Sequence, residues 1–221
     1  MNGIKKTGII FCAILLLAGI SGCSSSTEDI IQKQSEEKIT TQEKKDKSET
    51  EQESSEEERN ILVAYFSCTG TTKKAAEYAS DILGADLYEI TSAEAYTAED
   101  LDYNDDNSRT SIEQNDVTAR PQINGSVENM DEYDIILLGY PIWWGKAPRI
   151  ISSFVESYDF DGKTIVPFCT SGGSGFGSSG EELQKMCTDN ATWKEGTRFG
   201  SDVTREAVEE WIDGLEVEGK E

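Results

Sequence analysis

The sequence predicts an α/β domain in which a doubly wound parallel sheet carries helices on both faces. Short apolar runs of strand length alternate along residues 61–215 with segments whose apolar residues recur every three or four positions. Two of the runs, residues 61–66 and 134–139, are almost continuously apolar, as expected of parallel strands that are buried on both faces. In such folds ligands bind beyond the carboxyl ends of the strands, where the strand order reverses.

The first strand and the helix after it form the clearest unit. The strand 61–66 is followed by a loop of small and hydroxyl-bearing residues, Ser67-Cys68-Thr69-Gly70-Thr71-Thr72. A helical pattern over residues 71–83 begins at once, so that loop amides and the positive end of the helix dipole converge on one point. No lysine stands where a P-loop would have one. We therefore expect neutral donors that hold a terminal monophosphate without transferring it.

The remaining elements follow from the same two periodicities. We expect a short strand at 85–91, strands at 134–139 and 163–170, a helix at 148–158, a helix from Ser178 or Ser179 through Met186, a fifth strand within 192–199 and a last helix from Ser201. The apolar face of that last helix is predicted to contain Val203, Ala207, Trp211 and Leu215.

Residues 92–132 do not fit the alternation. They are acidic and poor in apolar side chains, and Arg120-Pro121 lies near their end. A stretch of this length without an obvious element is unusual inside a domain, and it indicates a functional lid or a partly helical excursion.

Two further loops of unusual composition follow predicted strands. The first reads Tyr140-Pro141-Ile142-Trp143-Trp144-Gly145, and its aromatic side chains can stack on a flat ring. We expect one tryptophan to pack inward and the other to contact a ligand. The second loop, residues 170–175, is rich in glycine, which lets the backbone approach a ligand closely. In a parallel sheet all three loops would face one crevice.

Composition removes several classes of chemistry. The chain of 221 residues contains no histidine, which excludes Ser-His-Asp and Cys-His catalysis and imidazole-ligated metal sites. Its five cysteines include no CxxC pair, so neither a disulfide framework nor a zinc knuckle is implied. The net charge of −23 argues against nucleic acid and for basic docking partners, although an acidic surface also simply favours solubility.

The N-terminal region is predicted to lie outside the folded domain. Residues 1–23 combine a basic start with a short apolar run and end in Ile20-Ser21-Gly22-Cys23, which resembles the bacterial lipoprotein box. That resemblance implies acylation of Cys23 and a lipid anchor on the outer side of the cytoplasmic membrane. Residues 24–60 are Ser-, Glu-, Lys- and Gln-rich and are expected to form a solvated tether. Residues 216–221 are expected to form a polar tail.

Together, the three loops resemble those of the flavodoxin-like family, and more specifically bacterial members that carry a YPIWWG segment. The likeness covers about residues 60–215. It implies a five-stranded parallel sheet in the order 2-1-3-4-5 that binds FMN non-covalently. The FMN phosphate would be held by Ser67, Thr69, Gly70, Thr71 and Thr72. The isoalloxazine ring would be flanked by Pro141, Ile142, Trp143, Trp144 and Gly145. Its polar edge would meet Thr170, Ser171, Gly172, Gly173 and Gly175.

The resemblance implies a flavoprotein that works as an electron carrier or as a reductase, including one of the NAD(P)H:quinone type. Its partner would be a redox protein or a small electron acceptor. Two other classes remain open on the sequence. Cys68 opens a phosphate-sized loop, as in cysteine phosphatases, but Lys74 stands where those enzymes have an arginine. A surface module that has kept the fold and lost the flavin is the other.

Overall fold

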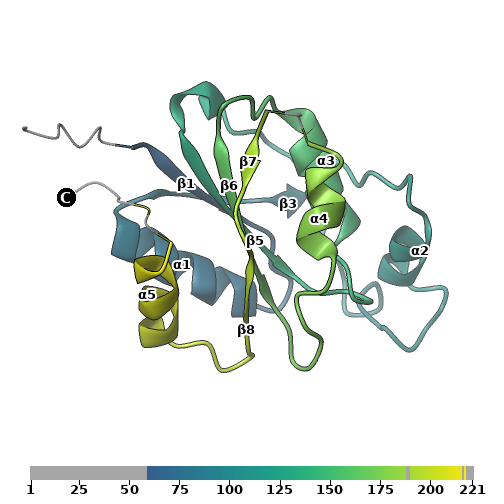
Figure 1. Ribbon diagram of the computed structural model, residues 1–221. Coiled ribbons are helices and arrows are strands. Elements are labelled where there is room, and N and C mark those ends of the chain that lie inside the picture. Colours follow the sequence, from purple (N-terminus) through teal and green to yellow (C-terminus); the bar gives the residue numbers. More distant parts are fainter. Residues whose placement is uncertain (1–58, 188–189, 216, 218–221) are drawn as a thin grey trace, which may run out of the picture. The chain divides into compact units, whose positions relative to one another are not determined.

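The computed structural model describes residues 59–187, 190–215 and 217. The predicted leader (1–23) and all but the last two residues of the predicted tether (24–60) lie outside the described residues. The centre of the fold is a parallel sheet in the order β2-β1-β5-β6-β7, with β8 also paired to β6 (Figure 1). Its strands are β1 (Ile61–Tyr65), β2 (Asp86–Glu89), β5 (Ile135–Pro141), β6 (Thr164–Thr170), β7 (Thr192–Trp193) and β8 (Thr197–Phe199).

This order confirms the predicted five-stranded arrangement, with one refinement at its edge. The fifth strand is broken into β7, which pairs with β6 at Thr164 and Ile165, and β8, which pairs with it from Phe168 onward. Pro167 lies between the two pairings. Alternate residues of β6 turn their N–H groups toward β7 and β8, and the N–H of Ser171 donates there to the carbonyl oxygen of Phe199. Pro167 has the same orientation but lacks an N–H. A proline cannot donate to a ladder, so the edge strand is interrupted beside it.

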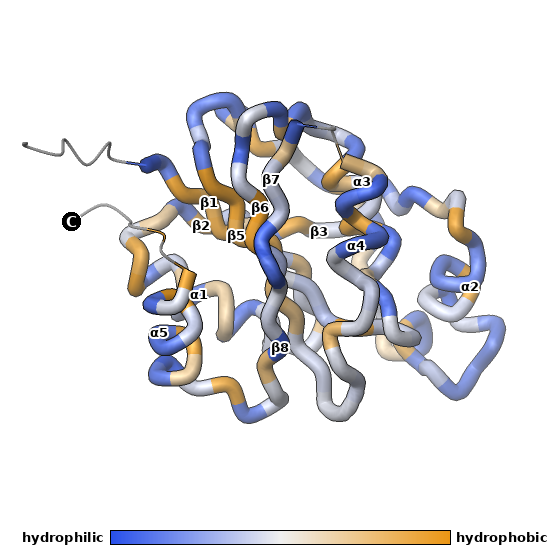
Figure 2. The backbone as a smooth tube through the Cα atoms, viewed as in Figure 1, coloured by the Kyte–Doolittle hydropathy of each residue, from blue (hydrophilic) through white to orange (hydrophobic). Residues whose placement is uncertain are grey.

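The helices cover both faces of the sheet (Figure 1). On one face, α1 (Thr71–Leu83) and α5 (Arg205–Asp213) pack on strand residues such as Val63 and Leu137. On the other, α3 (Arg149–Ser157) and α4 (Ser179–Gln184) pack on neighbours such as Leu62 and Leu138. Successive strand side chains point to opposite faces, so one apolar run supplies both cores. The central strands accordingly form the most hydrophobic part of the fold (Figure 2).

The C-terminal helix differs from its prediction. It begins at Arg205 rather than near Ser201, because the Thr204 hydroxyl accepts a hydrogen bond from the Ala207 N–H and caps it. Of the predicted apolar face, Val203 is buried and Trp211 and Leu215 pack against the same core, but Ala207 is exposed. The helix also buries Val208 and Ile212. The predicted polar tail is also wrong at one position, since Val217 is buried in the same core.

The helix predicted from Ser178 or Ser179 is α4, which ends at Gln184 rather than Met186. Ser178 occupies the N-cap position, but its hydroxyl donates to the Glu182 carboxylate and caps no backbone amide. Within the described residues, no helix is long and apolar enough to cross a membrane.

Residues 92–132 form a folded insertion that contains a helix. This agrees with the partly helical excursion, one of the two alternatives that the sequence predicts. It contains α2 (Arg109–Asn115), β4 (Ile123–Asn124) and the 3-10 turn η1 (Met130–Glu132). β4 pairs in antiparallel fashion with β3 (Thr91–Ser92) in a two-stranded sheet of their own. The insertion therefore leaves the main sheet after β2 and returns before β5.

Candidate functional site

The first loop ends in a helix N-terminus whose amides are free to bind a ligand. Gly70 has a φ of 89°, a left-handed conformation that glycine adopts without strain, and its N–H donates to the Ser67 hydroxyl at 3.1 Å. No side chain caps α1 in this part of the described chain, and its first turn contains no acidic residue. The first amides of a helix have no partner within it. They therefore remain available to an anion beside the hydroxyl loop.

The two lysines of the first helical turn are directed elsewhere. Lys73 forms a long ion pair with Glu89, at 3.8 Å. Lys74 donates from Nζ to the carbonyl oxygen of Val203 at 2.8 Å. The donors of the loop are thus neutral hydroxyls and amides, as the sequence predicts.

Thr170, the last residue of β6, joins all three predicted loops. Its hydroxyl lies 2.7 Å from that of Thr72, in the first turn of α1, and both side chains are buried. Its carbonyl oxygen accepts a hydrogen bond from the N–H of Ile142, in the second loop, at 3.0 Å. The predicted convergence of the loops at one end of the sheet is therefore present.

The second loop contains a tight turn centred on Trp144 and Gly145. Trp143 and Lys146 exchange backbone hydrogen bonds of 2.9 and 3.0 Å across it. Both central residues have positive φ, 47° for Trp144 and 75° for Gly145, as in a type I′ turn. Trp144 is the only non-glycine residue of the described chain with positive φ.

One of the two tryptophans packs inward, as predicted, while contact of the other with a ligand stays a prediction. Trp143 packs edge-on against Phe66, with ring centroids 5.5 Å apart, and against Tyr96 at 5.6 Å. Phe66 and Tyr96 contact each other at 5.7 Å, so the three rings form a closed cluster. Trp144 is 48% exposed at the tip of the turn. Trp144 is therefore the tryptophan free to stack on a ligand.

A cavity of about 340 Å³ lies between the first and second loops. Eight of its lining residues come from those loops: Ser67, Cys68, Thr69, Thr72, Pro141, Ile142, Trp143 and Trp144. The other predicted site residues do not line it: Gly70, Thr71, Gly145, Thr170, Ser171, Gly172, Gly173 and Gly175. The insertion contributes Leu101, Tyr103 and Thr110, which the sequence analysis missed. The only signal for them was the length of the insertion itself.

The third loop is anchored at its start and open afterwards. The backbone of Ser171 donates to Phe199 and accepts from Arg198 Nη2, and its hydroxyl accepts from the Gly173 N–H. A Cβ added at Gly172, Gly173 or Gly175 would meet nothing within 4 Å. The glycines of this loop thus leave open space beside the backbone.

Comparison with known proteins identifies the family. Residues 60–215 match the family described as Flavodoxin. The chain belongs to the flavodoxin family. Among curated proteins, no match was found.

Solved structures agree with this assignment. A protein of Bacteroides eggerthii DSM 20697 assigned as a flavoprotein is 47% identical with a TM-score of 0.68, over 72% of this chain and 99% of that one. One of Bacteroides uniformis ATCC 8492, also assigned as a flavoprotein, is 43% identical with a TM-score of 0.67, over 71% and 99%. A Lactobacillus acidophilus NCFM flavoprotein in complex with FMN is 22% identical with a TM-score of 0.53, over 70% and 99%, which shows the fold alone.

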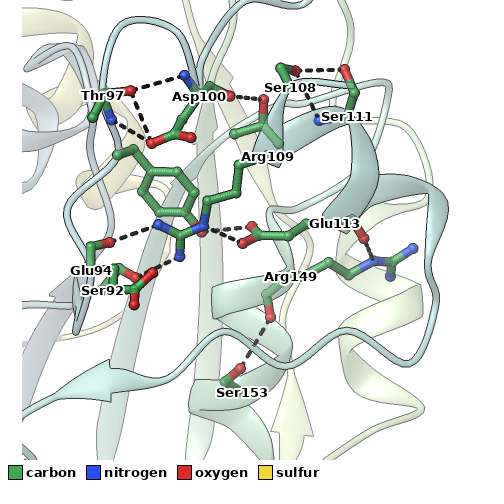
Figure 3. A network of polar contacts seen from close by, with 12 residues as sticks. Ser92, Glu94, Thr97, Asp100, Ser108, Arg109, Ser111, Glu113, Arg149 and Ser153 are labelled. Atoms are coloured by element: carbon green, nitrogen blue, oxygen red, sulfur yellow. Dashed lines mark hydrogen bonds and ion pairs between the residues drawn. The ribbon is translucent and has the colours of Figure 1, made fainter. Parts of the chain in front are cut away.

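In this flavodoxin-family chain a polar network holds the insertion together (Figure 3). The Arg109 guanidinium donates to the Glu113 carboxylate at 2.7 Å, to the Glu94 carbonyl at 2.8 Å and to the Ser92 hydroxyl at 3.0 Å. It also stacks 4.0 Å from the ring centroid of Tyr96, whose hydroxyl donates to Glu113. Burial and that hydrogen bond raise the pKa of Tyr96, which remains protonated. The network fixes the ring that supports Trp143.

Cys68 lines the cavity as a neutral thiol. Burial raises its pKa to about 12, although the nearby Arg109 cation opposes the shift. A thiol acts as a nucleophile through its thiolate, which a low pKa favours. A thiol with a raised pKa gives no support to the cysteine phosphatase alternative.

Proposed function

We propose that this protein binds FMN and works as a redox protein. One observation carries the proposal: the cavity places an uncapped helix N-terminus and neutral hydroxyls beside the turn that exposes Trp144. The amides and hydroxyls suit a phosphate, and the exposed indole suits a flat ring. These are two ends of one ligand, and the family is one of flavodoxins. The FMN complex of the L. acidophilus relative supports the same choice of ligand.

Each part of the site would have its own task. The loop of Ser67, Thr69 and Thr72 would hold the phosphate, and Trp144 would cover one face of the ring. The backbone of the glycine loop would meet the polar edge of the ring. FMN, when bound, supplies the electron or hydride chemistry, and the chain supplies binding and orientation. No side chain is then required as an acid or a base.

The lining residues that the insertion adds favour an enzyme that reduces a small acceptor over a protein that only carries electrons. Leu101 and Tyr103 add an apolar wall to the cavity, which an electron carrier with an exposed flavin edge does not need. Such a wall can shelter a flat acceptor such as a quinone. Steady-state oxidation of NAD(P)H with a quinone acceptor by the FMN-loaded protein tests this second step. Turnover that requires a partner protein instead would favour the carrier.

The proposed location rests on the sequence of residues 1–60. Acylation of Cys23 would anchor the protein outside the cytoplasmic membrane, with residues 24–60 as a tether. Labelling with a fatty acid tests this, and Cys23→Ala should abolish the label and release the protein from the membrane fraction. The acidic balance of the chain favours a basic redox partner.

Titration of the full-length protein with FMN tests the central proposal. We expect a bound flavin spectrum and quenched flavin fluorescence with one equivalent of FMN. Riboflavin, which lacks the phosphate, should bind more weakly. Protein that remains colourless after FMN addition would exclude the proposal and would favour a module that has lost the flavin.

A further inference from the structure

One side chain of the insertion holds the Trp144–Gly145 turn from outside. Gln114, near the end of α2, donates from Nε2 to the carbonyl oxygen of Trp143 at 3.0 Å and to that of Ala147 at 3.3 Å. These two carbonyls bracket the turn. Gln114 is 8% exposed, and its Oε1 is buried without a partner among the described residues. Only the NH₂ group of the amide can donate to two carbonyl oxygens. The two hydrogen bonds therefore orient the amide, and they leave its oxygen without a partner among the described residues.

The start of α3, just after the turn, holds the insertion in return. Arg149, the first residue of α3, donates from Nη2 to the carbonyl oxygen of Gln114 at 3.0 Å and from Nε to that of Glu113 at 3.3 Å. These are carbonyls of the last turn of α2, which have no partner within the helix. Figure 3 shows Arg149 reaching the end of α2 beside the Arg109–Glu113 pair. α2 and the segment around Trp144 therefore stabilise each other by an exchange of hydrogen bonds.

The conformation of Trp144 requires such support. A bulky side chain at a φ of 47° is disfavoured by its own backbone. The indole is about half exposed, so core packing does not select this conformation. The restraints come from its neighbours: the Trp143 ring is packed against Phe66 and Tyr96, and the carbonyls on either side are held by Gln114.

We propose that Gln114 is a positioning residue that holds the Trp144 turn in the conformation that presents its indole to the flavin ring. This inference rests on the proposed function. Gln114 does not line the cavity and lies on a different element from the phosphate loop. It acts on binding of the ring and not of the phosphate. Loss of its hydrogen bonds should therefore weaken FMN and riboflavin by the same factor.

Gln114→Met in the full-length protein removes both donors and nearly preserves the length of the side chain. Dissociation constants for FMN and riboflavin should both rise about tenfold, as expected for the loss of buried hydrogen bonds. Ser67→Ala, in the phosphate loop, should weaken FMN alone. Gln184→Met makes the same chemical change at an exposed position of α4 and should leave both constants unchanged. Wild-type constants in Gln114→Met, or a loss confined to FMN, would overturn the proposal.

A readout without flavin separates this proposal from the proposed function. In fluorotryptophan-labelled protein, the fluorine NMR signal of Trp144 is assigned through Trp144→Phe. That signal should shift or broaden in Gln114→Met and remain in place in Gln184→Met. An unchanged signal would contradict the positioning role of Gln114, whether or not the wild-type protein binds flavin. A wild-type protein that binds no flavin would contradict only the proposed function. If Gln114→Met does not fold, Gln114→Ala removes the same two donors without placing a long apolar side chain against the carbonyl oxygens, and it should show the same changes.

Discussion

The hydroxyl of Thr72 lies 2.7 Å from the hydroxyl of Thr170, although 98 positions separate the two residues in the chain. Thr72 stands in the first turn of α1 and Thr170 at the end of β6. Both side chains are buried, so the bond is sheltered from water. It fixes the phosphate loop relative to the glycine loop, two of the three segments that form the proposed site.

Removal of one of these hydroxyls should destabilise the fold more than removal of both. Thr72→Val or Thr170→Val leaves a buried hydroxyl without its partner, and each should lower the free energy of unfolding by about 1–3 kcal/mol. The double variant removes the unpaired group and should be no less stable than either single variant. Urea unfolding of the four proteins measures the coupling. Additive losses would show that the two hydroxyls do not depend on each other.

Trp144→Asn should separate stability from flavin binding. Asn-Gly is the preferred sequence of a type I′ turn, and asparagine tolerates positive φ far better than tryptophan. We expect the flavin-free protein to gain about 0.5–1 kcal/mol because backbone strain is relieved. Affinity for FMN should fall, since the exposed indole is lost. Thermal unfolding and FMN titration check the two effects. A loss of stability would contradict the strain argument, and unchanged affinity for FMN would contradict the assignment of Trp144 to the ligand.

Gly139 is required by the close approach of β6. A Cβ at this position would lie 2.3 Å from the ring of Phe168, its register partner in the neighbouring strand. Gly139→Ala should therefore destabilise the fold by about 1–3 kcal/mol, as overpacking of a core does. Gly172→Ala meets open space and serves as the control. Equal unfolding midpoints in urea for the two variants would contradict the packing argument.

The buried thiol of Cys169 and the half-buried thiol of Cys68 should make stability fall at alkaline pH. Burial raises the pKa of Cys68 and of Cys169 to about 12, from about 9 for an ordinary thiol. Between these values the unfolded chain loses thiol protons that the folded chain retains, so a rise in pH favours unfolding. Stability contributed by the neutral thiols is complete below pH 9 and is lost toward pH 12.

Urea unfolding of wild type, Cys68→Ser and Cys169→Ala across this range measures the thiol contribution. Several tyrosines also titrate at high pH, so the difference between wild type and variant isolates the thiols. Each variant should show a shallower decline than wild type. Rapid alkylation of Cys68 by iodoacetamide at pH 8 would contradict its raised pKa.

Much of the fold could be predicted from local patterns. The predicted helix 71–83 matches α1, because alanines at helical spacing end at Gly84, which adopts the left-handed C-cap. The central strands were predicted because both of their faces are buried. The predicted start of the C-terminal helix was wrong because Ser201 and Thr204 are both plausible caps. The capping hydrogen bond from the Ala207 N–H is accepted by Thr204.

The site was predicted less completely than the fold. The residues of the first two loops could be identified, since each follows a strand directly and carries an unusual composition. Leu101, Tyr103 and Thr110 could not, because they belong to a segment with no strand or clear helical period. The fact that Trp143 packs inward while Trp144 is exposed depends on the rings of Phe66 and Tyr96, which the sequence places far from either tryptophan.

By itself, the sequence determined the parallel sheet and two walls of the cavity, because hydrophobic periodicity and loop composition are local properties of the chain. The strand order was predicted only through the resemblance to a known family. Only the tertiary structure decided which tryptophan is exposed, how Pro167 interrupts the fifth strand and where the insertion docks. These outcomes depend on contacts between distant segments. The bonds from Gln114 to Trp143 and Ala147, and from Arg149 back to α2, arise only when a segment of no clear pattern packs beside a strand end.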